Sequence, residues 1–133
     1  MKVVLDTNIF ISGIFWTGVS NKILRLWKKN IFQLVTSKEI IEEFIKVMKD
    51  FKIRLSKDII NEWVNLILQN SILVKPKEKL NILVDIKDNM FLEAALEGNA
   101  NYIITQDKHI LKLREFKNIR IIKTDDFIKI ILA

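Results

Sequence analysis

Short apolar runs alternate with longer amphipathic stretches along most of the chain. The apolar runs, rich in Val and Ile, predict strands at 2–5, 32–35, 72–74, 102–105 and 120–122. The stretches between them repeat apolar residues with helical spacing. They predict helices at 21–29, 37–51, 57–69, 89–97, 108–114 and 125–132.

Strands that alternate with helices form βαβ units and therefore a parallel sheet. The predicted strands are continuously apolar, as expected when helices cover both faces of the sheet. The expected fold class is α/β, a three-layer α/β/α sandwich around a central parallel sheet of about five strands. We expect residues 1–133 to form a single domain, with 75–79 as a surface loop.

Composition narrows the class of protein. The chain has no Cys, which excludes disulfides and thiolate metal sites and fits a reducing cytoplasm. No apolar run is long enough for a signal peptide or a membrane span, so we expect a cytoplasmic protein with no membrane partner. The formal charge of +6 suits a polyanion such as nucleic acid, although a Lys-rich composition alone explains it equally well.

Two acids follow predicted strands directly. Asp6 follows the first strand and is succeeded by Thr7-Asn8, and Asp107 comes shortly after Thr105. Ligands of parallel α/β sheets bind beyond the carboxyl ends of the strands, where both acids would lie. The alternatives are structural: an Asx turn for Asp6 and a helix N-cap for Asp107.

The helix predicted at 37–51 carries three glutamates with different surroundings. Residues 36–39 read as a capping box, which accounts for Glu39. Glu42 lies nearly opposite the apolar stripe and is expected to pair with Lys46. Glu43 lies at the edge of that stripe and can reach inward, which makes it the candidate for a site.

A third acidic segment precedes the helix at 89–97. Either Asp85 or Asp88 is expected to cap that helix, and Gly98 is expected to stop it. Extrapolated backwards, the helix places Asp88 on its sheet-facing side, with Phe91, Leu92 and Ala95. Asp85 is then a supporting residue in the preceding turn.

Carboxylates gathered in one crevice repel one another unless cations compensate. Hard oxygen ligands, with one His and no Cys, favour Mg²⁺ or Mn²⁺ over Zn²⁺. Such a site polarises a phosphate and activates water, and two ions about 4 Å apart would clamp both oxygens of a displacement.

Four segments together resemble the PIN domain, the nuclease fold of VapC-type toxins. They are Asp6-Thr7-Asn8 and the segments 36–44, 85–95 and 102–111. The sequence departs from the usual family pattern at Gln106, where Gly is common, and at Ile86, where Pro is common. Neither departure removes a carboxylate.

The resemblance implies a site and an activity. It assigns the metal ligands and catalytic acids to Asp6, Glu43, Asp88 and Asp107, with Asn8 and Thr105 as polar support. It implies cleavage of single-stranded RNA by metal-activated water, leaving a 3′-hydroxyl and a 5′-phosphate. It also implies a small antitoxin partner and a homodimer. Lys108 and Lys38 are candidates for binding substrate phosphates, with solvated surface lysines as the alternative.

Other readings remain open. A non-catalytic PIN-like module that binds RNA or protein would share this sequence pattern, and a structure-specific DNA nuclease would share the carboxylate chemistry. Trp16, in the segment Phe15-Trp16-Thr17-Gly18, would either stack on a base or anchor its loop, and anchoring is the commoner role. Trp63, with the nearby Ile59, suits a core position and a protein interface equally well.

Overall fold

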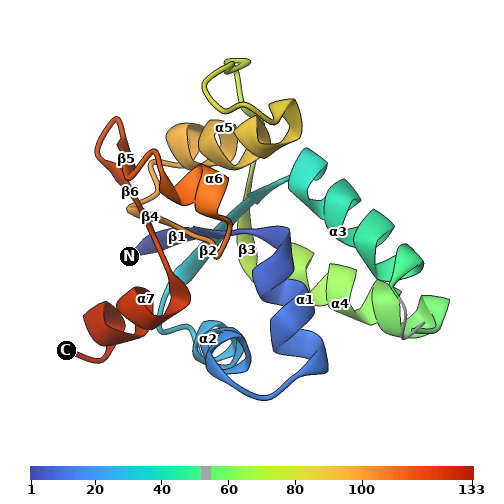
Figure 1. Cartoon of the computed structure of the whole chain (residues 1–133). Helices are drawn as coiled ribbons and strands as arrows, with labels where there is room; N and C mark the ends of the chain where they lie inside the picture. The colour runs from blue at the N-terminus through green and yellow to red at the C-terminus, as the bar shows by residue number, and fades with distance from the viewer. Residues whose placement is uncertain (52–54) are drawn as a thin grey trace.

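The computed structural model describes residues 1–51 and 55–133 (Figure 1). It contains a six-stranded sheet in the order β3-β2-β1-β4-β6-β5. All neighbouring pairs are parallel except β5 with β6. The strands are β1 (Lys2–Leu5), β2 (Gln33–Ser37), β3 (Ser71–Val74), β4 (Tyr102–Ile104), β5 (Glu115–Phe116) and β6 (Ile119–Ile122).

Helices connect these strands and surround the sheet. They are α1 (Thr7–Phe15), α2 (Val19–Lys28), α3 (Lys38–Asp50), α4 (Lys57–Gln69), the 3₁₀ helix η1 (Ile86–Asp88), α5 (Asn89–Glu97), α6 (Lys108–Leu111) and α7 (Thr124–Ile131). Among the described residues, no helix is long and apolar enough to cross a membrane.

Successive residues of β1 enter two different hydrophobic clusters. Val3 and Leu5 pack with side chains of α1 to α4 and α7, whereas Val4 packs with side chains of α5 and α6. In Figure 1, α5 and α6 accordingly lie on one side of the sheet, and α1, α2 and α7 lie on the other. The predicted α/β/α class is confirmed, and the predicted parallel sheet gains a sixth strand, β5, which is antiparallel to β6.

The structure has three elements that the hydrophobic pattern did not predict, namely α1, the short helix η1 and β5. α1 is apolar on most of its surface, with Ile9, Phe10 and Ile11 all buried, so it shows no simple amphipathic stripe. β5 pairs with β6 across a two-residue turn, Lys117-Asn118, in which both φ angles are positive. The usual sequence signal of such a turn is Asn-Gly or Asp-Gly, and neither pair occurs at this position.

Gly98 ends α5 for a different reason from the one predicted. Its φ is −87°, which any residue adopts, and Asn99 is the residue with a positive φ. A Cβ on Gly98 would lie 2.6 Å from Val35 Cγ1. Gly98 therefore allows the end of α5 to approach β2 closely.

Candidate functional site

The predicted acids line one small pocket at the carboxyl edge of the sheet. The pocket has a volume of about 120 Å³. β1 and β4 are hydrogen-bonded neighbours there, although β2 follows β1 in the chain. This is the switch in strand order at which open α/β sheets bind ligands. The lining residues are Asp6, Thr7, Asn8, Glu43, Val47, Asp85, Lys87, Asp88, Met90, Phe91 and Asp107.

Thr105 links Asp6 to Asp107. The Thr105 hydroxyl donates to Asp6 Oδ2 over 2.6 Å and accepts the Asp107 N–H over 3.0 Å. The other oxygen of Asp6 accepts the Asn8 N–H over 3.2 Å. Because Thr105 is fully buried, this chain of bonds holds the Asp6 carboxylate in one orientation.

Asp6 and Asp107 also perform the structural roles that were the alternatives. Asp6 is the N-cap of α1. Asp107 caps α6, with Oδ1 accepting the His109 N–H over 2.8 Å. Each carboxylate still lines the pocket, so capping and a role in the site are compatible here.

Glu43 comes to the pocket from α3, where it is half-buried. The capping box predicted at 36–39 is wrong, because Ser37 is the N-cap and its hydroxyl accepts the Ile40 N–H. The predicted partner of Glu42 was also wrong. Glu42 pairs with Lys38 over 3.8 Å, and this exposed ion pair is the only one within 4.0 Å among the described residues.

Asp85 and Asp88 have different roles in the turn before α5. Asp85 caps η1, with Oδ1 accepting the Lys87 N–H over 3.1 Å. Asp88 is the first residue before α5 but makes no capping hydrogen bond with its side chain. Its carboxylate is therefore available to a ligand in the pocket.

Asn89 holds this turn in place. Its Oδ1 accepts the N–H groups of Ile82 and Leu83, each over 3.0 Å, and its Nδ2 donates to the Ile86 carbonyl over 3.1 Å. Asn89 is only 1% exposed. This role was not predicted from the sequence, in which the only signal was an amide at the start of the helix.

Burial and mutual repulsion raise the pKa values of two site acids. Burial raises the pKa of Asp6 above 3.8, and the hydrogen bond from Thr105 opposes the rise only partly. Burial, followed by the charges of Asp85, Asp107 and Asp6, raises the pKa of Asp88 to about 6. The pocket therefore disfavours its own negative charge and would gain from a bound cation.

The donor set fits a hard divalent cation by its chemistry. The pocket offers carboxylate oxygens, and Thr7 adds a buried hydroxyl that has no hydrogen-bond partner among the described residues. The acids are not preassembled around one point, because no three His, Asp or Glu side chains among the residues described converge as a metal-binding group.

Lys87, the one Lys or Arg among the described residues that line the acidic pocket, was not predicted. Lys38 is 82% exposed and paired with Glu42, and Lys108 is not among the lining residues. Lys87 lines the pocket, and it also lines a neighbouring hollow that extends along α3 as far as Lys46. Nothing in the local sequence distinguishes Lys87 from the other exposed lysines.

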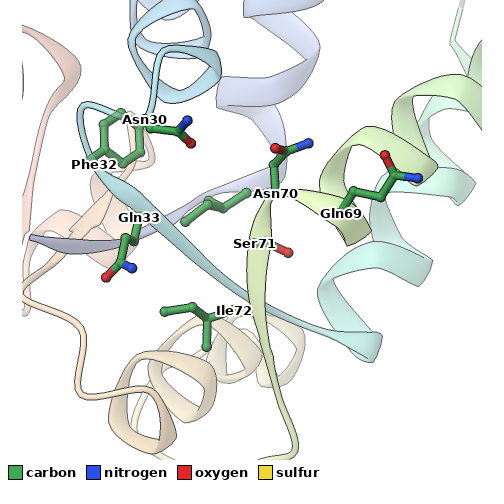
Figure 2. Close-up of a pocket in the computed structure, with 8 residues that line it drawn as sticks. Asn30, Phe32, Gln33, Gln69, Asn70, Ser71 and Ile72 are labelled. Carbon is green, nitrogen blue, oxygen red and sulfur yellow. The ribbon is translucent and has the colours of Figure 1, made fainter.

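A larger hollow of about 400 Å³ lies at the opposite, amino-terminal edge of the sheet (Figure 2). It is lined where β2 and β3 begin, by Gln33 and Ser71 among others, and by the end of α4. None of its lining residues is titratable, so size alone does not make it a candidate for catalysis.

Comparison with known proteins gives a family match and a relative. A family model described as PIN domain matches residues 2–109. An uncharacterized protein of Methanocaldococcus jannaschii, MJ1680, is 35% identical over 123 residues, which cover 86% of this chain and 76% of that protein.

Among solved structures, a chain of VapBC2 from Rickettsia felis, crystallised with a DNA fragment from its promoter, has a TM-score of 0.62. The match covers 92% of this chain and 98% of that chain at 18% identity, which establishes a shared fold. Together with the family match over most of the sequence, these observations show that the chain belongs to the PIN domain family.

Proposed function

We propose that this protein is a metal-dependent endoribonuclease that cleaves single-stranded RNA with Mg²⁺ or Mn²⁺ as its cofactor. The observation that carries the proposal is the meeting of Asp6, Glu43, Asp88 and Asp107 in one pocket. These acids come from four separate segments of the chain. No single structural role is common to all four acids and would explain why each of them lines the same pocket of about 120 Å³.

The side chains have distinct parts in this proposal. Asp6 is oriented by Thr105 and Asn8, and Asp107 by its cap to α6, so both present fixed oxygens. Asp88 makes no cap bond and would turn toward the cation with Glu43. A bound divalent cation would polarise the scissile phosphate and lower the pKa of the attacking water.

Lys87 supplies a positive charge beside these acids. We assign it to a phosphate of the bound strand, in preference to Lys38 and Lys108. A lysine at such a position attracts a backbone phosphate through charge rather than through base recognition.

We further propose that the protein is the toxin of a toxin–antitoxin pair and acts in the cytoplasm, as a homodimer bound by a small antitoxin. A chain of VapBC2 shares the fold of this protein, and the net charge of +6 suits an RNA substrate. Growth arrest on expression, relieved by the product of a neighbouring reading frame, would test the biological role.

The chemistry is tested by incubating the purified protein with a mixed pool of single-stranded RNA. The reactions contain Mg²⁺, Mn²⁺ or EDTA, and the protein is wild type or Asp6→Asn. We expect cleavage only with metal, and a loss of roughly 10²–10³-fold or more in the variant, comparable to deleting one electrostatic stabiliser. Asp58→Asn, at an exposed position in the first turn of α4, is the matched control.

Asp6→Asn should remain folded, because burial already disfavours the charged carboxylate and an amide oxygen can accept the same N–H. Cleavage by folded Asp6→Asn at the wild-type rate would refute the assignment of the site. Cleavage that persists in EDTA would refute the metal dependence.

The alternative is a PIN-like module that binds RNA or a protein without cleaving. The absence of a preassembled three-acid group among the described residues is the observation that favours it. Calorimetric titration with Mn²⁺ separates the two: a nuclease of the proposed kind binds Mn²⁺ through Asp6, whereas such a module need not.

A further inference from the structure

A second pocket, of about 300 Å³, lies beside the acidic one. We call it the Trp16 pocket. It is formed by the turn between α1 and α2, the residue after Thr105, and the start of α7. Its lining residues include Ser12, Trp16, Thr17, Ser20, Gln106 and Thr124.

Two features place this pocket next to the acids. Asn8 in the acidic pocket and Ser12 in the Trp16 pocket are four residues apart on α1, which is one helical turn of about 6 Å. Gln106 and Asp107 are consecutive, and they line the two pockets respectively. Gln106 is tied to α7 because its Oε1 accepts the Thr124 N–H over 3.4 Å. The two pockets are therefore neighbours, although no residue lines both.

Trp16 is both exposed and held. Its side chain is 54% exposed, although large aromatic residues usually bury most of their surface. Its ring lies 5.8 Å from that of Phe51, edge to face, and 5.9 Å from that of Phe15. Phe15 and Phe51 stack on each other at 4.6 Å. The anchoring role expected for this residue is present, and it leaves much of the indole accessible.

The turn that carries Trp16 is set by Gly18. Its φ of 139° lies in a region that side chains with a Cβ rarely adopt. The Asn21 amide then ties α2 to α1 by donating to the Gly13 carbonyl over 2.8 Å. The backbone that carries Trp16 consequently has one defined conformation.

The chemistry of the lining selects a neutral aromatic ligand rather than a phosphate. None of the residues that line this pocket is a Lys or Arg, and Asp125 would repel an anion. Hydroxyl and amide groups at Ser12, Thr17 and Gln106 can exchange hydrogen bonds with the edge of a base. An accessible indole face is a stacking platform for any base of a single strand.

We propose that the Trp16 pocket receives the base of a nucleotide next to the phosphate held at the acidic pocket, with Trp16 as the stacking partner. This inference rests on the proposed function, since it names a subsite for the same RNA strand. It makes Trp16 a binding residue that sets how the strand lies across Asp6 and Asp107.

The test measures RNA binding without cleavage. A single-stranded RNA oligonucleotide of mixed sequence is titrated into Asp6→Asn protein, and tryptophan fluorescence and anisotropy are recorded. Trp27 is only 1% exposed and Trp63 lines neither pocket, so quenching by a stacked base should come mainly from Trp16. In the same background, Trp16→Leu keeps an apolar side chain against Phe51 but removes the aromatic face. We expect it to weaken binding by roughly 5–150-fold, the effect of one base–aromatic stack.

Two further variants make the result specific. Trp16→Phe retains an aromatic face and should restore most of the affinity. Trp63→Phe is the matched control, because Trp63 lies on α4 with Lys28 over its ring at 4.5 Å and lines neither pocket. In otherwise wild-type protein, Trp16→Leu should raise KM for RNA cleavage with little change in kcat.

The outcomes distinguish this inference from the function on which it rests. Metal-dependent cleavage by wild type, with Trp16→Leu equal to Trp63→Phe in affinity and KM, would overturn the subsite alone. Wild-type protein that neither binds nor cleaves RNA would overturn both. RNA binding that requires Trp16, without cleavage under any metal condition, would support the subsite and overturn the nuclease.

Discussion

Of the four aspartates that line the acidic pocket, Asp88 has the least structural use. The carboxylates of Asp6, Asp85 and Asp107 each accept hydrogen bonds from nearby N–H groups, whereas Asp88 has no capping bond. Burial and its acidic neighbours nevertheless raise the pKa of Asp88 to about 6. A residue whose charge the fold opposes, and which the fold does not use, is well suited to a ligand role.

Asp88→Asn should therefore stabilise the metal-free protein in a pH-dependent way. The folded protein keeps the Asp88 proton up to about pH 6, whereas the unfolded chain releases it near the ordinary pKa of 3.8. Ionisation consequently costs stability as the pH rises from about 4 to 7. We expect the Tm of Asp88→Asn to exceed that of wild type at pH 7–8 and to approach it at pH 4.

Thermal unfolding in EDTA across this pH range measures the effect. Glu62→Gln, at an exposed position of α4, provides the control for removing one surface charge. A Tm difference for Asp88→Asn that is constant from pH 4 to 8, or that shrinks as pH rises, would contradict the assignment of cost to the ionised carboxylate.

At the scale of elements, side chains of α5 bind the backbone of the loop 77–83, which leads into the site. Asn89, Glu93 and Glu97 are spaced four residues apart on one face of α5. Asn89 accepts hydrogen bonds from the backbone N–H groups of Ile82 and Leu83. Glu93 accepts one from the N–H of Leu80, and Glu97 accepts one from the N–H of Lys77. One helix face thus replaces a neighbouring strand as the partner of an extended segment, and the segment delivers Asp85 and Lys87 to the pocket.

Asn89→Leu should loosen this loop more than its size suggests. The change removes three hydrogen bonds at a buried position, at a cost of roughly 2–4 kcal/mol in unfolding free energy. Amide hydrogen exchange should accelerate at 82–88, and Mn²⁺ affinity should fall by about 10–100-fold, as for loss of a residue that orients ligands.

Glu97→Gln is the matched control, because it keeps an oxygen acceptor for the Lys77 N–H farther along the loop. Unchanged exchange at 82–88 in Asn89→Leu would show that the loop does not depend on this amide.

At the scale of the whole molecule, the acidic pocket exists only in the folded chain. Asp6 and Asp107 meet because β1 pairs with β4, about a hundred residues away, and Glu43 and Asp88 arrive on helices that pack near that edge. A ligand of this pocket must therefore bind the folded state in preference to the unfolded one.

Mn²⁺ should raise the Tm of the wild-type protein. At a free concentration of 100 times Kd the expected gain in folding free energy is about 2.7 kcal/mol. Differential scanning calorimetry with and without Mn²⁺ measures it, and Asp6→Asn should show little or no gain. An equal gain in both proteins would place the cation elsewhere on the molecule.

Sequence and structure agree most closely where the deciding interactions are local. Helix α4 was predicted at its observed bounds, and the strand positions were predicted to within one or two residues, because side-chain periodicity reflects which face is buried. The hairpin of β5 and β6 and the all-round apolar α1 were missed, since neither leaves a simple periodic or turn signal. The cap of α3 was misassigned by one residue, from Thr36 to Ser37, because both have side-chain hydroxyls.

The sequence by itself determined the fold class, five of the six strands in their order and the acids that stand after strands, because these follow from local periodicity and the parallel α/β plan. Only the tertiary structure decided which polar groups share a pocket. It brought Lys87, rather than Lys38 or Lys108, to the pocket that the acids line. It also joined Asn89 to the loop at Ile82 by a hydrogen bond, and it placed the Trp16 pocket beside Asp107. These placements depend on the pairing of β1 with β4 and on helix packing across the sheet. Such contacts join residues far apart in the chain and leave no periodic trace in the sequence around any one of them.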